Sequence, residues 1–115
     1  MIEGGTYARG ETISFLAGVS SGVVGDVTGT PEADLKRLYG NVLPRNIAPV
    51  VAQLAVASSA ASGDIPAGWT ITVTDEQSAA LGAGEYVFDL RCVIGGGAYI
   101  SEPVKFSLVE AVTVR

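Results

Sequence analysis

Residues 68–91, which read GWTITVTDEQSAALGAGEYVFDLR, decide the fold of this chain. In the first part, Trp69, Ile71 and Val73 alternate with threonines, which is the pattern of a half-buried β-strand. A second alternating run begins at Glu85, and a short polar segment joins the two runs. This layout predicts a β-sandwich corner, at which the chain passes from one sheet to the other.

The polar segment predicts one short helical turn over residues 75–81. Thr74 is followed three positions later by Gln77, which is the spacing of a capping box. Asp75 and Glu76 then fall in the first turn, where a carboxylate interacts favourably with the helix dipole. We expect Gly82 to stop the helix.

Residues 85–94 predict a long strand, followed by a hairpin turn at 95–97 and a return over 98–108. Three consecutive glycines supply the backbone freedom that a hairpin turn needs. Pro103 is expected to interrupt the returning strand or to mark a sheet edge. The residues expected to face the core are Tyr86, Phe88, Leu90, Cys92, Ile94, Val104, Phe106 and Leu108.

The N-terminal half gives weaker patterns. Residues 12–17 predict a strand, and the Gly-, Ser- and Thr-rich residues 18–30 predict a loop. Residues 31–39 fit either a strand, by their two-residue period, or a helix with Thr30 as N-cap and Pro31 at its first position. The strand is favoured because the rest of the chain is β.

The middle of the chain predicts one further strand between two loops. Residues 44–49 contain two prolines and are expected to connect elements, and 58–68 form a loop of small residues. Between them, residues 50–56 predict a strand. Its inward side chains are expected to be Val50, Ala52, Leu54 and Val56.

About seven short strands separated by turn signals predict an all-β fold, an Ig-like antiparallel β-sandwich. At 115 residues the chain is expected to form a single domain over residues 1–115. Tyr86 follows the turn at the position of the corner tyrosine of Ig-like sandwiches, which ties its hydroxyl to upstream backbone. Phe88 stands where antibody domains carry a cysteine. We therefore expect a structural role for Tyr86.

Charge and hydropathy exclude some classes of partner. The chain has 7 basic and 12 acidic residues, and its basic residues are scattered, whereas nucleic-acid phosphates are bound by clustered Lys and Arg. Neither a basic amphipathic helix nor a run of about 20 apolar residues occurs. We therefore expect no nucleic-acid partner and no membrane association.

The single cysteine excludes an internal disulfide, and residues 1–5 lack the features of a signal peptide. We therefore expect the chain to be made and folded in a reducing cytosol. Only 17% of its residues are charged, which suits a subunit whose surfaces are covered in an assembly.

The sequence offers little chemistry for catalysis. Without histidine, a Ser-His-Asp triad and the usual zinc sites are excluded. Cys92 lies in an apolar strand with no basic partner, so we expect a buried structural thiol. We predict no catalytic, cofactor or metal site, and no enzyme activity. The acids considered for a hydrolytic pair are Asp64, Asp75, Glu76, Glu85 and Asp89, and an ion pair between Asp89 and Arg91 is the simpler reading.

Trp69 is the only tryptophan. Exposed, it would suggest a sugar-binding platform, but at the head of an alternating strand it is expected in the core. A carbohydrate-binding module that uses Trp69, Tyr99 or Tyr39 on an exposed face is nevertheless a second hypothesis.

The chain resembles small Ig-like β-sandwich proteins of tailed bacteriophages, including the N-terminal domain of baseplate upper proteins. The similarity lies in residues 72–81, in the pattern Gly84-x-Tyr86-x-Phe88, in the Gly-rich hairpin and final strand, and in the opening residues 9–15. It covers residues 6–17 and 69–115. Proteins of this family are non-enzymatic parts of virions that serve as head decoration, neck, baseplate or fibre-attachment modules.

The resemblance implies a virion structural protein assembled in the host cytoplasm. Because no long segment is available for a fibre or receptor-binding tip, a capsid decoration (cement) protein that binds the head lattice is favoured. A baseplate, neck or fibre-attachment adaptor of the tail is the alternative. The expected partners are the major capsid protein or other virion subunits, and the chain could form a homo-oligomer such as a trimer.

Overall fold

The structure is a computed structural model that describes residues 2–18, 31–40, 48–59, 68–94, 97–100 and 102–111. Within these ranges the chain forms ten strands and one helix. In chain order they are β1 (Ile2–Ala8), β2 (Ile13–Gly18), β3 (Glu32–Arg37), β4 (Ala52–Gln53), β5 (Ala55–Ser59), β6 (Gly68–Val73), α1 (Asp75–Ala80), β7 (Gly84–Phe88), β8 (Leu90–Ile94), β9 (Gly97–Ile100) and β10 (Val104–Val109).

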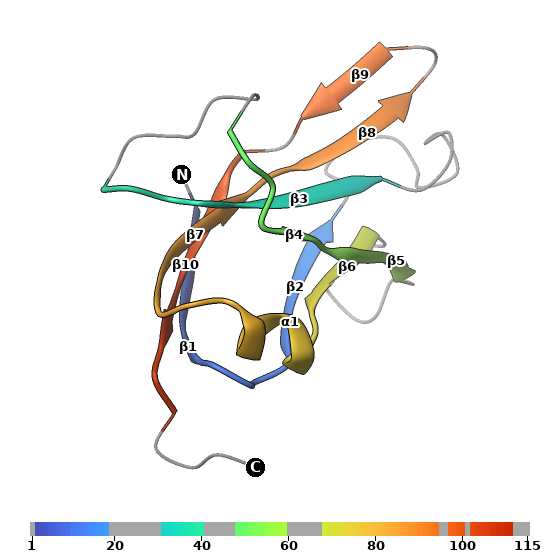
Figure 1. Cartoon of the computed structure of the whole chain (residues 1–115). Coiled ribbons are helices and arrows are strands. Elements are labelled where there is room, and N and C mark those ends of the chain that lie inside the picture. The colour runs from blue at the N-terminus through green and yellow to red at the C-terminus, as the bar shows by residue number, and fades with distance from the viewer. Residues whose placement is uncertain are drawn as a thin grey trace.

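Two sheets face each other, and α1 lies across one end of the space between them (Figure 1). The small sheet has the order β2-β6-β5, and the large sheet has the order β1-β10-β7-β3-β8-β9, with β4 also pairing with β3. The order β2-β6-β5 opposite β10-β7-β3-β4 is the strand order of an Ig sandwich. The predicted all-β, Ig-like sandwich is therefore confirmed.

The long strand predicted over residues 85–94 is present, but it is interrupted at Asp89. β7 and β8 both pair antiparallel with β3 in one continuous register, with Lys36 opposite Val87 and Glu32 opposite Arg91. The returning strand is likewise divided, into β9 and β10, and Pro103 lies in the interruption as expected. The hairpin is confirmed by the pairing of β8 with β9, whereas Gly95 and Gly96 lie outside the described residues.

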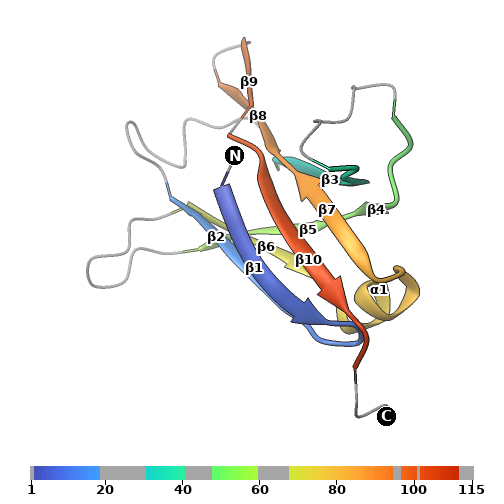
Figure 2. The same cartoon turned by 90° about the vertical axis from the view of Figure 1, so that its left-hand side faces the viewer.

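Strand β1 was not expected from the sequence. It lies beside β10 and runs parallel to it, as Figure 2 shows, with Ile2 opposite Val104 and Ala8 opposite Val109. The register shifts between Glu3 and Thr6, and Gly5 in that interval has a φ of 99°. A glycine bulge thus adapts this strand to its neighbour.

The predicted strand over residues 50–56 is divided at Leu54, where the chain passes from the large sheet to the small one. The Leu54 N–H still donates to Ala33 O on β3 at 2.9 Å, and the next residue begins β5, which pairs with β6. Leu54 is buried as expected, and Ala52 and Val56 pack against the core. The expectation that Val50 faces inward was wrong, because the strand begins only at Ala52 and leaves Val50 exposed.

The remaining strand predictions are confirmed. Residues 12–17 correspond to β2, and the ambiguous residues 31–39 form β3 rather than a helix. The predicted loop over 18–30 lies outside the described residues except for Gly18, which belongs to β2. The predicted loop over 58–68 was wrong at its ends, since β5 extends to Ser59 and β6 begins at Gly68, while 60–67 lie outside the described residues.

A single apolar core fills the space between the sheets. Both sheets supply its side chains, among them Ile71 and Trp69 from β6 and Phe106 from β10. The buried cluster consists of Ile13, Ala33, Leu35, Leu54, Trp69, Ile71, Val73, Leu81, Tyr86, Phe88, Leu90, Phe106 and Leu108. The core positions predicted for Trp69 and Tyr86 are therefore confirmed.

The helical turn α1 has the predicted start but a different end. Thr74 Oγ1 accepts from the Gln77 N–H at 3.1 Å, and Gln77 Oε1 accepts from the Thr74 N–H at 3.0 Å, which completes the capping box. The helix ends at Ala80, and Leu81 is its C-cap in an extended conformation. The expectation that Gly82 stops the helix was wrong, since the backbone is already extended at Leu81 and Gly82 does not have a left-handed backbone.

Candidate functional site

Tyr86 forms the corner expected from the sequence. Its hydroxyl donates to Gly82 O at 2.5 Å, four residues upstream. The same hydroxyl accepts from Arg37 Nη1 at 3.3 Å, and the Arg37 guanidinium lies over the ring at 5.3 Å from its centroid. Arg37 Nη2 also donates to Ala83 O at 3.1 Å. This cluster closes one end of the sandwich, which is a structural role.

Arg37 is a partner that sequence reasoning missed. It belongs to β3, far from Tyr86 in the chain, and only the register that places Arg37 opposite Tyr86 brings the two together. The signal available in the sequence was the two-residue period of residues 31–39, which puts Arg37 on the same face as Leu35.

Cys92 is less buried than expected. It lies on β8 opposite Tyr99 and is only half-buried. The reason is that the β8–β9 hairpin extends beyond the small sheet, so its inner side has no facing layer (Figure 1). The thiol remains a packing residue at the margin of the core rather than a fully enclosed one.

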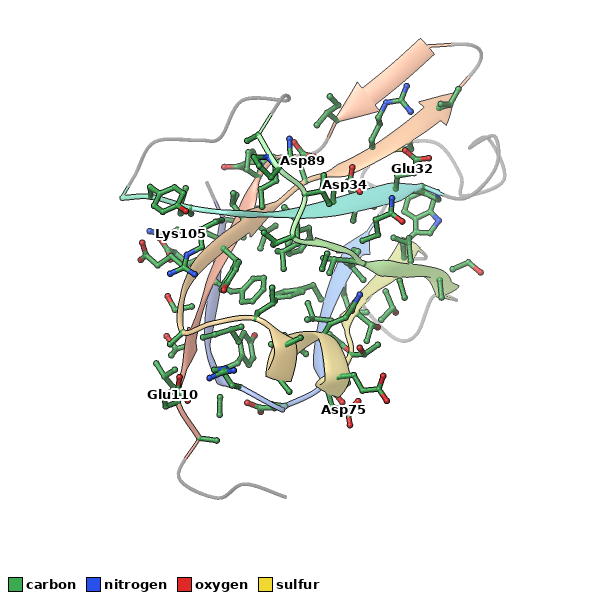
Figure 3. All side chains as sticks on the ribbon, in the orientation of Figure 1. Glu32, Asp34, Asp75, Asp89, Lys105 and Glu110 are labelled. Atoms are coloured by element: carbon green, nitrogen blue, oxygen red, sulfur yellow. The ribbon has the colours of Figure 1, made fainter. Side chains whose placement is uncertain are left out.

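The carboxylates considered for a hydrolytic pair are not brought together. Asp75 lies at the start of α1, at the opposite end of the molecule from Asp89 (Figure 3). Glu76 is its exposed neighbour on the helix, and Glu85 lies on β7 opposite Ser107. Asp64 is outside the described residues.

Asp89 instead lies beside an acid that the sequence reading did not select. Continuing the β3 register between Lys36–Val87 and Ala33–Leu90 places Asp34 directly opposite Asp89. Figure 3 shows the two side chains close together on one side of β3, with Glu32 further along the same strand. Partial burial raises the pKa of Asp89, Asp34 acts in the same direction, and Lys36 opposes both.

The predicted ion pair between Asp89 and Arg91 was wrong. Lys36 and Asp34 are the charged side chains that act on Asp89, whereas Arg91 lies in a register row with Glu32 and Ile100. Because the strand is interrupted at Asp89, Asp89 and Arg91 do not belong to one regular strand. The charged side chains on the neighbouring strand β3 therefore determine the environment of the Asp89 carboxyl.

Two opposed carboxyls can share a proton, but the surroundings give them no further chemistry. In the described ranges, no group of three or more acidic or cysteine side chains could hold a metal ion. Asp34 is exposed and Asp89 is only partly buried. The chemical consequence of the pair is therefore a local repulsion that depends on pH.

A polar cluster ties both ends of the described chain to α1. Ser78, which is completely buried, donates to Glu11 O at 2.7 Å and accepts from the Gly10 N–H at 3.0 Å. Arg9 donates to Glu110 at 2.8 Å and to Ala79 O at 2.8 Å. The cluster holds the β1–β2 turn, the helix and the end of β10 in place.

Exposed apolar side chains are the remaining feature with a functional meaning. Those of Ile2, Leu16, Tyr39, Val50, Val51, Ile100 and Val109 are all exposed. Three of them, Tyr39, Val50 and Val51, lie in the segments that follow β3 and precede β4, and we call them the β3 patch. The Val51 N–H donates to Leu35 O at 2.8 Å, which ties the residue before β4 to β3.

Two apolar residues are buried on the outer side of the large sheet. Leu38 and Val87 are buried but do not belong to the main core cluster. Val87 alternates with Tyr86 and Phe88, which face the core, so it faces the other side of the sheet. The Leu38 N–H donates to Glu85 O at 2.9 Å, which holds Leu38 alongside β7.

Comparisons with known proteins do not extend this description. No family model and no curated protein matches the chain. In the part of the chain that the structure describes, no helix has the length and hydropathy needed to cross a membrane.

Proposed function

We propose that this chain is a structural subunit of a tailed-phage virion, a capsid decoration (cement) protein that binds the head lattice. The observation that supports this proposal best is the β3 patch, in which Tyr39 is 76% exposed and Val50 and Val51 are exposed as well. Neighbouring apolar side chains exposed together mark a surface that a partner covers. The phage resemblance supplies the kind of partner, a subunit of the capsid.

The arrangement of the patch fits a subunit that docks as a rigid body. β3 is paired on both sides, with β7 and β8 on one side and β4 on the other, and the Arg37–Tyr86 cluster fixes its end. Val51 is tied to this frame, because its N–H donates to Leu35 O of β3 at 2.8 Å. A capsid subunit would therefore meet a surface attached to a rigid strand.

The test uses particles of the phage or prophage whose genome carries the gene. Mass spectrometry of purified virions is expected to detect the chain, and heads stripped of it are expected to rebind the purified chain while tails do not. In a sedimentation assay, Tyr39→Asp should weaken binding to heads at least about tenfold, because a carboxylate would be buried without a partner. Ile100→Asp, at another exposed apolar residue, on β9, is the matched control.

The outcomes separate the proposal from its alternatives. Binding to tails and not to heads would favour a baseplate, neck or fibre-attachment adaptor. Absence of the chain from purified particles would overturn a virion role of either kind.

Carbohydrate binding remains a second candidate because Tyr39 offers an exposed aromatic ring. Trp69 is buried and cannot serve as a sugar-binding platform. The structure does not describe the side chain of Tyr99. Calorimetric titration with an oligosaccharide panel tests this candidate. A heat of binding that disappears in Tyr39→Ala would support it, and the absence of any heat would reject it.

A further inference from the structure

The small sheet differs from the rest of the chain in its charge. None of the residues in β2, β6 and β5 is Asp, Glu, Lys or Arg, although the chain carries 19 charged residues, 7 basic and 12 acidic. The core-facing side chains of this sheet, such as Ile13 and Ile71, alternate with side chains on its outer face. The outer face is formed by Ser14, Leu16, Ala55, Ala57, Thr70 and Thr72.

The outer face has one large side chain and otherwise small ones. Leu16 is 62% exposed on the edge strand β2, and Ala57 is exposed on the opposite edge strand β5. Both are paired with Thr70 of the central strand, so Leu16, Thr70 and Ala57 form one row across the sheet. The outer surface of this row therefore protrudes at Leu16, which has a large side chain, and is lower at Ala57, which has a small one.

We infer that a second copy of this chain packs on this face, with a two-fold axis that runs along β6 in the interface. Rotation about that axis places β2 of one copy over β5 of the other. Each row of residues across the sheet keeps its position along the strand direction, so it meets the same row of the other copy. Leu16 of each copy then lies over Ala57 of the other, and Thr70 faces Thr70 on the axis. An isologous interface requires such self-complementarity.

Charge also favours a second copy as the occupant. The chain carries a net charge of −5, so two copies repel each other over most of their surfaces. The outer face of the small sheet is a surface on which they can meet without burying like charges. A partner with a basic surface would gain nothing from an uncharged face and would be drawn to the acidic groups elsewhere.

The size of the face sets the expected strength. Three strands about 4.8 Å apart, each with about six residues rising about 3.3 Å, give a footprint of about 300 Å² per copy. Stable complexes bury about 800 Å² per partner, so we expect a weak dimer that forms only at high protein concentration. This inference does not depend on the virion role, because it concerns the isolated chain.

The test is sedimentation velocity of the purified chain at protein concentrations up to about 1 mM. A weak dimer is detectable only at such high concentrations. We expect a reversible monomer–dimer equilibrium. Leu16→Lys should weaken the dimer more than about tenfold, because an unpaired ammonium would have to be buried against the partner. Ile100→Lys, at a residue 63% exposed on the large sheet, is the matched control and should leave the equilibrium unchanged.

A charge pair tests the geometry itself. Ala57→Glu alone should also weaken the dimer, whereas Leu16→Lys combined with Ala57→Glu should restore it, because each lysine would face a glutamate of the other copy. Within one chain the two positions are separated by β6, so the rescue requires a second copy. Thermal unfolding of each variant checks that it is folded.

Three results would overturn the inference: a monomer at all concentrations, a trimer, or a dimer insensitive to Leu16→Lys. Salt gives an independent check. Raising the ionic strength should strengthen the dimer, because it screens the repulsion between two acidic chains. A dimer that salt dissociates would be held by charges elsewhere.

Discussion

At the scale of single residues, the side chains that hydrogen-bond in the interior do structural work. Tyr86 ties the corner to Gly82 O, and the buried Ser78 joins the β1–β2 turn to α1. A buried polar group needs such partners because removing it from water is costly. Asp34 and Asp89 lie opposite each other on the outer side of the large sheet, where Asp89 is only partly buried.

Tyr86→Phe tests the corner. The substitution removes the hydroxyl that donates to Gly82 O and accepts from Arg37, and we expect a loss of about 1 kcal/mol in the free energy of unfolding. Urea titration measures it. Tyr39→Phe is the matched control, since the exposed ring should lose nothing. Equal stability of Tyr86→Phe and the unmodified chain would refute the role of the corner.

Asp89→Asn tests the opposed carboxyls. The pKa of Asp89 is raised in the folded chain above its ordinary value of 3.8, mainly by burial, so the folded chain binds this proton more tightly than the unfolded one. The resulting destabilisation is fully present above the folded-state pKa and disappears as the pH falls below 3.8. Asp89→Asn should therefore be more stable than the unmodified chain at pH about 7 and no more stable at pH about 3.

Urea midpoints at the two pH values measure this difference. Asp75→Asn provides a control of opposite sign at neutral pH, because its carboxylate lies in the first turn of α1 and favours the helix dipole. A gain from Asp89→Asn that persists unchanged at low pH would have a cause other than ionisation.

At the scale of elements, the alternating strands and the capped helix were predictable, because their side chains carry the signal. Trp69, Ile71 and Val73 alternate with threonines, and Thr74 and Gln77 have the spacing of a capping box. The change of sheet at Leu54 and the break between β7 and β8 at Asp89 were not predictable, since both interrupt a strand within a run that keeps its alternation. Nor was Asp34, whose position opposite Asp89 depends on a register between distant strands.

Strand β1 escaped prediction for a different reason. Its side chains are mostly exposed, and it contains Gly4 and Gly5, which have no side chains to form a pattern. What holds it is the backbone ladder with β10 and the packing of Tyr7 against Phe15 and Phe106. Sequence patterns report burial of side chains and say little about a strand held in this way.

Gly4→Ala tests how closely β1 is packed. A Cβ at this position would lie 2.8 Å from Lys105 O and 2.8 Å from Phe15 Cε1, closer than atoms in contact approach. The strand would have to move, so we expect a loss of roughly 1–3 kcal/mol in the free energy of unfolding. Gly82→Ala, whose Cβ would meet only Arg37 at an ordinary distance of 3.7 Å, is the control. A Gly4→Ala variant as stable as that control would show that β1 is loosely attached.

At the scale of the whole molecule, both sheets contribute to one core. Trp69 and Ile71 of the small sheet belong to the same buried cluster as Phe88 and Phe106 of the large sheet. The Arg9 and Ser78 contacts add polar links at the end where α1 lies. Neither sheet can expose its inner face without exposing that of the other.

Cooperative unfolding is the expected result. Trp69 fluorescence reports on the small sheet, whereas far-UV circular dichroism averages over both sheets. Because the two sheets share a core, we expect the two signals to give the same urea midpoint, as in a two-state transition. Emission of the folded chain should be blue-shifted, since Trp69 is buried. A tryptophan transition that precedes the loss of dichroism would show that the small sheet can separate.

The parallel pairing of β1 with β10 has a consequence for biosynthesis. β1 is made first, but its neighbour in the sheet ends at Val109. On the ribosome, the N-terminal strand therefore waits without its partner until nearly all of these residues have left the exit tunnel. Contacts between such distant segments form slowly, so the nascent chain remains open to chaperones and completes its large sheet only after translation has passed residue 109.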